Sequence, residues 1–286
     1  MIEINIPVAI TFALLYNIIQ NLSKGLQKYA IDGASLEYLR EKNKDPEHRK
    51  KFRLWMWGTI GTIGSNAFLV MAQPFAPHSS FSVAFGGFGL LSLVVYSHFK
   101  LNENIRTPEI LGALIILVAT FLFGIFVEDT KPIGIKYNIL STISLTLLGV
   151  LIILALISRN SGYRGHEFVW GIISGFFGGM GAVLLQTSAI SSGRDYGSMT
   201  KTWDLWIALL CAFLAFASTQ YGFKHGNATI IVTIYNAISL LVPIIMDIYV
   251  LEKEIPAFQL VMLGFIGFGT ILLTAFRDWD KKVKKQ

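Results

Sequence analysis

Polar side chains interrupt several long apolar segments, and one of them is a carboxylate. Asp247 is the only acidic residue well inside such a segment, and it lies four positions after Pro243. Proline removes a helical hydrogen bond, so we expect Pro243 to break its helix and free backbone carbonyl oxygens. A carboxylate beside such a break could coordinate a cation or carry a proton, which makes Asp247 the candidate metal ligand. A carboxylate near the end of a segment can also extend to the membrane interface.

Neutral amide side chains supply further oxygen atoms inside apolar segments. Such groups are costly in lipid, so each is a candidate for lining a transport path. Each could equally form a hydrogen bond between helices, and convergence in one cavity would decide between the two. Together with Asp247, the path candidates are Asn17, Gln20, Asn66, Gln186 and Asn236.

Glycines cluster within the same segments rather than in loops. A phosphate-binding glycine loop follows a strand, so these clusters do not predict one. Gly171 and Gly175 have the spacing that lets two membrane helices approach closely. The candidate hinges are Gly86, Gly87, Gly178, Gly179 and the proline Pro243.

The composition indicates where these segments reside. Of the 286 residues, 53% are hydrophobic and only 15% are charged, and the mean hydropathy is +0.56. A soluble domain of this size needs a charged exterior, so lipid is the solvent that fits. The single cysteine, Cys211, permits no disulfide within the chain and no cysteine-based metal site.

Nine runs are long enough to cross a hydrocarbon core as helices, which takes about 20 residues each. The first could be a cleaved signal peptide, but Glu3 precedes it and basic residues follow it, which favours a retained span. The predicted fold class is therefore an all-α, polytopic membrane helix bundle. The runs are Ile4–Leu22, Leu54–Phe75, Ser79–Phe99, Ile105–Val127, Tyr137–Ile157, Phe168–Ser191, Leu205–Phe223, Ala228–Val250 and Phe258–Phe276.

The basic residues predict an orientation. With nine spans, 19 of the 24 lysines and arginines fall on the side that holds the C-terminus. Cytoplasmic loops carry this excess, so we expect the N-terminus outside and the C-terminus in the cytoplasm, in the plasma membrane. The basic loop 23–53 and the tail 281–285 either fix this orientation or also bind anionic lipid headgroups. The net charge of +6 therefore does not indicate a nucleic-acid partner.

The sequence also contains a weak internal repeat. A shift of about 150 residues lays spans 2 to 4 over spans 7 to 9, with Pro108 matching Pro256 and Gly112 matching Gly264. Five spans separate the copies, so the second must be inverted in the membrane. We therefore predict two halves, 1–130 and 131–286. Inverted repeats are typical of carriers that bind a solute between the halves and alternate access.

Several short stretches resemble the NIPA family of magnesium transporters, within the drug/metabolite transporter (DMT) superfamily, also described as EamA-like. The stretches are Lys24-Gly25-Leu26, Leu54-Trp55-Met56-Trp57-Gly58, Phe75-Ala76-Pro77, Leu101-Asn102-Glu103, Ser218-Thr219-Gln220 and Asn227-Ala228-Thr229-Ile230-Ile231.

The resemblance implies a plan of ten helices with the second helix missing, hence four plus five, and a divalent cation such as magnesium as the solute. Asn66 stands where the NIPA pattern has an acidic residue.

Three alternatives stay open beside magnesium transport. The first is export or exchange of a small organic metabolite, which is common in the superfamily. The others are a membrane-embedded enzyme and a scaffold. No HExxH or G-x-S-x-G motif is present, so we expect no enzyme and no cofactor. The expected partners are the solute and the lipid bilayer, and a homo-oligomer is left open.

Overall fold

The computed structural model describes residues 5–31, 46–75, 85–100, 107–126, 134–160, 165–226, 228–252 and 256–275, and these residues are helical apart from short connections. The long helices are α1 (Ile6–Tyr29), α3 (Pro46–Ala72), α5 (Gly86–Lys100), α6 (Thr107–Ile125), α7 (Tyr137–Asn160), α8 (His166–Ser191), α10 (Trp203–His225), α11 (Ala228–Tyr249) and α12 (Ala257–Ala275). Two short elements, η2 (Gln73–Phe75) and α9 (Tyr196–Met199), follow α3 and α8.

Each of the nine expected runs coincides with one long helix, but not all of these helices qualify as spans. Five are long and apolar enough to cross a membrane, namely α1, α7, α8, α10 and α11. The described residues therefore form an all-helical, multi-pass membrane protein. The count of nine spans stays a prediction. The basic tail and residues 32–45 of the predicted loop 23–53 lie outside the described residues.

The end of the first span was predicted wrongly. The Asn5 side chain caps α1 by accepting a hydrogen bond from the Val8 N–H, and the helix then continues to Tyr29 rather than ending at Leu22. Lys24 therefore lies inside α1 and is buried, not in a cytoplasmic loop. A lysine marks a boundary only where its amine can reach water, and here other helices cover it.

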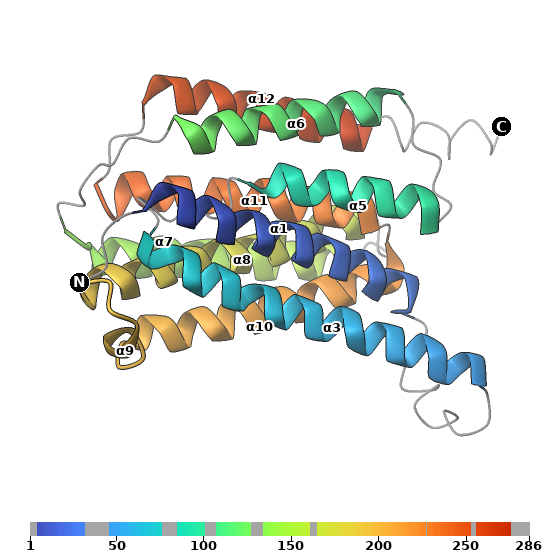
Figure 1. Ribbon diagram of the computed structural model, residues 1–286, viewed down its shortest axis with the longest axis horizontal. Coiled ribbons are helices and arrows are strands. Elements are labelled where there is room, and N and C mark those ends of the chain that lie inside the picture. Colours follow the sequence, from blue (N-terminus) through green and yellow to red (C-terminus); the bar gives the residue numbers. More distant parts are fainter. Residues whose placement is uncertain are drawn as a thin grey trace.

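The helices lie lengthwise beside one another in successive layers (Figure 1). α6 packs against α12, α5 lies between α6 and α1, and α1 packs against α3. In the same order α11 contacts α12 and α8, and α8 contacts α10. Each layer thus holds one helix from the set α1, α3, α5, α6 and one from the set α8, α10, α11, α12.

Contacts at the two ends of the bundle show how these helices run. At one end, here called the Phe75 end, Arg194 after α8 donates to the Pro74 carbonyl and Asn5 before α1 donates to the Phe75 carbonyl. At the other, the Tyr29 end, Lys28 of α1 donates to carbonyls at the end of α10. The start of α8 also lies there, because His166 contacts the Tyr221 carbonyl. α1 and α8 therefore begin at opposite ends.

Glycines bring α8 and α11 into direct backbone contact. A Cβ added to Gly171, Gly175 or Gly179 would come within 2.8 Å of a side chain of α11. The three contacts fall on Ile234, Ile238 and Val242, so both helices use residues at intervals of four. This small-residue packing is the usual way in which helices associate without a hydrophobic driving force.

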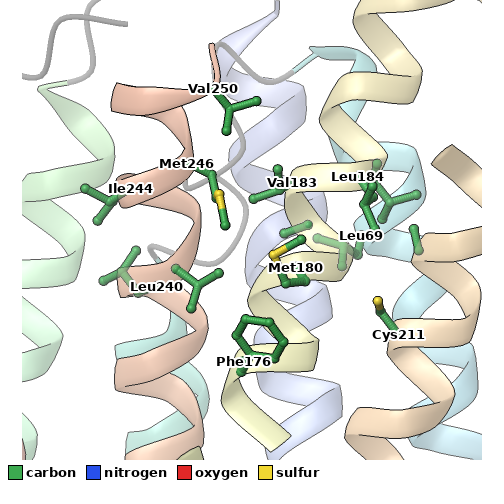
Figure 2. Packing of buried hydrophobic residues seen from close by; sticks show 14 of the residues in the cluster. Leu69, Phe176, Met180, Val183, Leu184, Cys211, Leu240, Ile244, Met246 and Val250 are labelled. Atoms are coloured by element: carbon green, nitrogen blue, oxygen red, sulfur yellow. The ribbon is translucent and has the colours of Figure 1, made fainter. Parts of the chain in front are cut away.

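The largest apolar cluster is centred on the same helix. Figure 2 shows Phe176 and Met180 of α8 between Leu240 of α11 and Cys211 of α10. α7, by contrast, buries few of its apolar side chains, and Leu145 and Ile153 are among those that are exposed. That exposure fits a helix that faces lipid.

We expect Gly175→Ala to lower the free energy of unfolding in detergent by about 1–3 kcal/mol, the usual cost of overpacking. The added methyl would meet the Ile238 side chain at 2.7 Å and the Tyr235 carbonyl oxygen at 2.8 Å. Gly64→Ala is the matched control, because a Cβ there meets nothing within 4 Å. Thermal unfolding compares the two variants, and equal stability would contradict this packing.

Candidate functional site

A cavity lies between α1, α3, α8, α10 and α11, near the middle of the bundle. Its polar lining comes mainly from α1 and α3, with Tyr16, Gln20, Lys24, Gln27, Thr62 and Asn66. α8 and α10 contribute mainly glycine, alanine and leucine side chains, and Tyr235 of α11 closes one side. The volume that the centre of a water molecule can occupy in this cavity is about 40 Å³, and holding one water takes about 10–15 Å³ of such volume. The cavity therefore accepts a few waters or a compact solute.

Lys24 is the only charged residue among those that line this cavity. Its side chain is 2% exposed, and Nζ lies over the Tyr235 ring at 3.1 Å from the ring centroid. Gln20 Nε2 donates to the hydroxyl of the same tyrosine at 3.4 Å. Gly178 of α8 makes room for this ring, because an added Cβ would lie 2.7 Å from the hydroxyl oxygen.

A chain of hydrogen bonds closes the cavity toward the Tyr29 end. Trp55 Nε1 donates to Gln220 Oε1 at 3.0 Å, and Gln220 Nε2 donates to Gln27 Oε1 at 2.6 Å. Gln27 Nε2 then donates to Thr62 Oγ1 at 2.9 Å. This chain joins α1 and α3 to α10, so it connects the two sets of helices.

Lys28 adds a second connection at the same end. Its Nζ donates to the carbonyls of Phe223 and Gly226 at 2.7 and 2.8 Å. These carbonyls lie at the end of α10, where the helix leaves acceptors without helical partners. At the Phe75 end, the corresponding connections are Arg194 to the Pro74 carbonyl at 2.6 Å and Tyr196 to the Met71 carbonyl at 2.9 Å.

The predicted path residues do not all converge. Gln20 and Asn66 line the cavity. Asn236 instead donates to Asn21 Oδ1 at 3.1 Å, and Asn17 Nδ2 donates to the Ala13 carbonyl within α1. Asn236 also borders a smaller cavity between α5, α6, α11 and α12, together with Gly86 and Gly87. Nothing in the sequence pattern distinguishes these two groups of amides.

The remaining candidates are buried in other places. Gln186 is fully buried on α8, and its amide atoms have no hydrogen-bond partner within the described residues. Asp247 is 1% exposed on α11 and is not among the residues that line the central cavity. Within the described ranges, no group of three or more His, Cys, Asp or Glu side chains gathers as a metal site would require.

Pro243 does not end its helix as expected. α11 continues through it from Ala228 to Tyr249. The missing N–H still leaves the Ser239 carbonyl without its helical partner. Gly179 allows α8 to pack against this position, because an added Cβ there would lie 3.0 Å from Pro243 Cδ and 3.1 Å from the Ser239 oxygen.

Sequence reasoning missed most of the polar lining. Lys24 and Gln27 follow the predicted end of span 1, so both were assigned to a loop. Nothing in the sequence around Tyr16 and Tyr235 distinguishes a tyrosine that lines a cavity from one that is packed in the core. A weak signal was available, because Gln20, Lys24 and Gln27 recur at intervals of four and three, as one helix face requires.

The fold and this cavity define a multi-pass helical membrane protein with an internal cavity that is mainly apolar and carries polar groups from α1 and α3. The chain is similar to a protein from Arabidopsis thaliana named "Probable magnesium transporter NIPA9". The two are 22% identical over 241 residues, which cover 77% of this chain and 68% of that protein. No protein-family model matches the chain, and no solved structure matches it.

We expect Gln27→Met to lower the free energy of unfolding by about 1–3 kcal/mol, because Gln220 then loses its acceptor in a buried position. The double variant Gln27→Met/Gln220→Met should cost less than the sum of the two single variants, since both ends of one bond are removed. Thermal unfolding of the three proteins measures this coupling. Strictly additive effects would show that the two amides do not interact.

Proposed function

We propose that this chain is a transporter of the DMT superfamily that moves a small solute across the plasma membrane by alternating access. The observation that carries this proposal is an internal cavity, mainly apolar but with an amine and several amides in its lining, between two sets of helices in a multi-pass membrane protein. A stable scaffold has no need of a buried chamber with an amine and several amides. The relative's name, a probable magnesium transporter, supports the same class of function and fits a protein that is not an enzyme.

The packing order supports an inverted repeat. In the first half, α1 contacts α3 and α5, and α5 contacts α6. In the second half, α8 contacts α10 and α11, and α11 contacts α12, which is the same order of contacts. The starts of α1 and α8 lie at opposite ends of the bundle. We take 1–130 and 131–286 as the two halves, with the N-terminus outside and the C-terminus in the cytoplasm. Rocking of one half against the other would open the cavity at one end at a time.

The contacts between the halves are suited to such a motion. The chain from Trp55 to Gln27 and the Lys28 contacts hold the Tyr29 end closed. Arg194 and Tyr196 hold the Phe75 end through backbone carbonyls. Each end is joined by a few hydrogen bonds, which can break and re-form at modest net cost.

Magnesium is the first candidate cargo, on the strength of the relative's name. Asp247 is the proposed ligand, because Mg²⁺ is bound through one or two carboxylates while it keeps several waters. Asp247 does not border the central cavity in this conformation, so magnesium transport requires a rearrangement of α11.

A small organic metabolite is the second candidate, and a specific observation favours it. Only Gln20 and Asn66 among the predicted oxygen ligands border the cavity, whereas Lys24 and two tyrosines do. An aromatic and partly apolar lining suits an organic solute more than a hard cation.

Flux into proteoliposomes tests transport directly. We expect at least one solute from a panel of magnesium, other divalent cations, organic acids and amino acids to enter faster than into empty vesicles. Gly178→Leu should reduce that flux about tenfold or more, because the side chain would collide with Tyr235 beside the cavity. Gly149→Leu is the control, since a Cβ at Gly149 meets nothing within 4 Å. A chain that moves no solute in the panel would contradict the proposal.

Labelling of single cysteines tests the orientation of the halves. The buried Cys211 is first replaced by alanine, and a cysteine is then placed at Lys100 or at Tyr249, both exposed. We expect a membrane-impermeant reagent to label the two positions from opposite sides of sealed vesicles, because they end α5 and α11, the helices that correspond in the two proposed halves. Labelling of both from one side would rule out the inverted arrangement.

A further inference from the structure

The amine of Lys24 lacks a neutralising partner. Within the described residues, Nζ has no hydrogen-bond acceptor, and it lies over the face of the Tyr235 ring. A ring face attracts a cation, but it carries no net charge to balance one. Burial of an ammonium group without a counter-charge is unfavourable, so a group held this way is suited to bind something that brings a negative charge.

The other polar groups around the cavity favour an anion over a cation. The described residues that line it include no aspartate or glutamate. The amide nitrogens of Gln20 and Asn66 already donate to the Tyr235 hydroxyl and to the Thr62 carbonyl, and each keeps a second N–H that a solute could accept. A divalent cation needs oxygen ligands with negative charge, whereas a carboxylate needs donors and a positive charge.

The opposite wall of the cavity is apolar and made of small residues. Gly181 and Leu185 of α8 face the cavity together with Ala208, Leu209 and Ala212 of α10. A solute with a charged head at Lys24 would therefore place its other end against aliphatic groups. The cavity volume, about 40 Å³ as measured for the centre of a water molecule, limits that solute to a compact one.

We propose that Lys24 binds the carboxylate of a compact organic acid in this cavity, with the aliphatic part of the acid against α8 and α10. The proposal rests on the proposed transport function and names the class of its solute. The carboxylate accepts hydrogen bonds from the Lys24 amine and from neighbouring donors, and its negative charge beside the amine favours the ammonium form.

Thermal unfolding of the full-length protein in detergent tests this, with sodium propionate as the probe at constant ionic strength. We expect saturating propionate to raise the midpoint of the native protein by about 5 °C, as a ligand that binds only the folded state does. Lys24→Met keeps the length of the side chain and removes the amine. It should fold with an equal or higher midpoint, because the unpaired buried amine is gone, and it should lose the shift with propionate.

Lys28→Met is the matched control, one helical turn further along α1. Its midpoint should fall, because two hydrogen bonds to α10 carbonyls are lost, yet the shift with propionate should persist. If Lys24→Met unfolds earlier and retains the propionate shift, Lys24 is a structural residue and the proposal is wrong. Equal shifts with sodium phosphate or chloride, and none specific to propionate, would also overturn it.

The outcomes separate this proposal from the broader one. Magnesium flux into proteoliposomes without any propionate shift would overturn the carboxylate site and leave the transporter in place. A propionate shift without flux of any solute would support the carboxylate site and overturn the transport function, because a binding site would remain in a protein that does not transport.

Discussion

The close approach of α8 and α11 is the constraint on which the cavity depends. Gly171, Gly175 and Gly179 let the two backbones touch along three successive turns. This contact fixes the position of Tyr235, and Gly178 on the neighbouring face leaves space for its ring. The Lys24 amine, which belongs to a helix more than 200 positions earlier in the chain, in turn lies over this ring. The glycines of α8 therefore determine, through Tyr235, where the Lys24 amine lies.

The polarity of the cavity is divided between the two sets of helices. α1 and α3 supply the amine and most of the amides and hydroxyls, whereas α8 and α10 supply small apolar surfaces. Some of the bonds that join the sets lie toward the ends of the bundle, at Lys28 and Gln220 on one side and at Arg194 and Tyr196 on the other. Two more, from Gln20 to Tyr235 and from Asn236 to Asn21, join α1 to α11 between these ends. This division of the lining is compatible with the proposed transfer of a compact solute.

The sequence predicted the positions of the helices well, because long apolar runs bounded by polar turns leave little freedom in lipid. The prediction failed mainly at the end of α1. A hydropathy pattern treats Lys24 as the end of a span whether its amine is buried or reaches water, and here it is buried. The site was predicted only in part. Gln20 and Asn66 border the cavity, while Asn236 bonds to Asn21 between helices, and all of them look alike in sequence. Pro243 shows the same limit, because α11 continues through it and Gly179 of α8 packs against that position. Side-chain partners that come from distant segments cannot be read from local pattern.

α7 contributes little to the core, because few of its residues are buried. It nevertheless affects the direction in which the later helices run. Four helices precede it and four long helices follow it among the described residues, so a chain without α7 would start its second set at the same end as its first. In the inverted arrangement that we propose, this one loosely packed helix is what reverses the second set. A duplication that carried such an extra crossing would give a protein with similar units facing both sides of the membrane, without any change to the packing inside either unit.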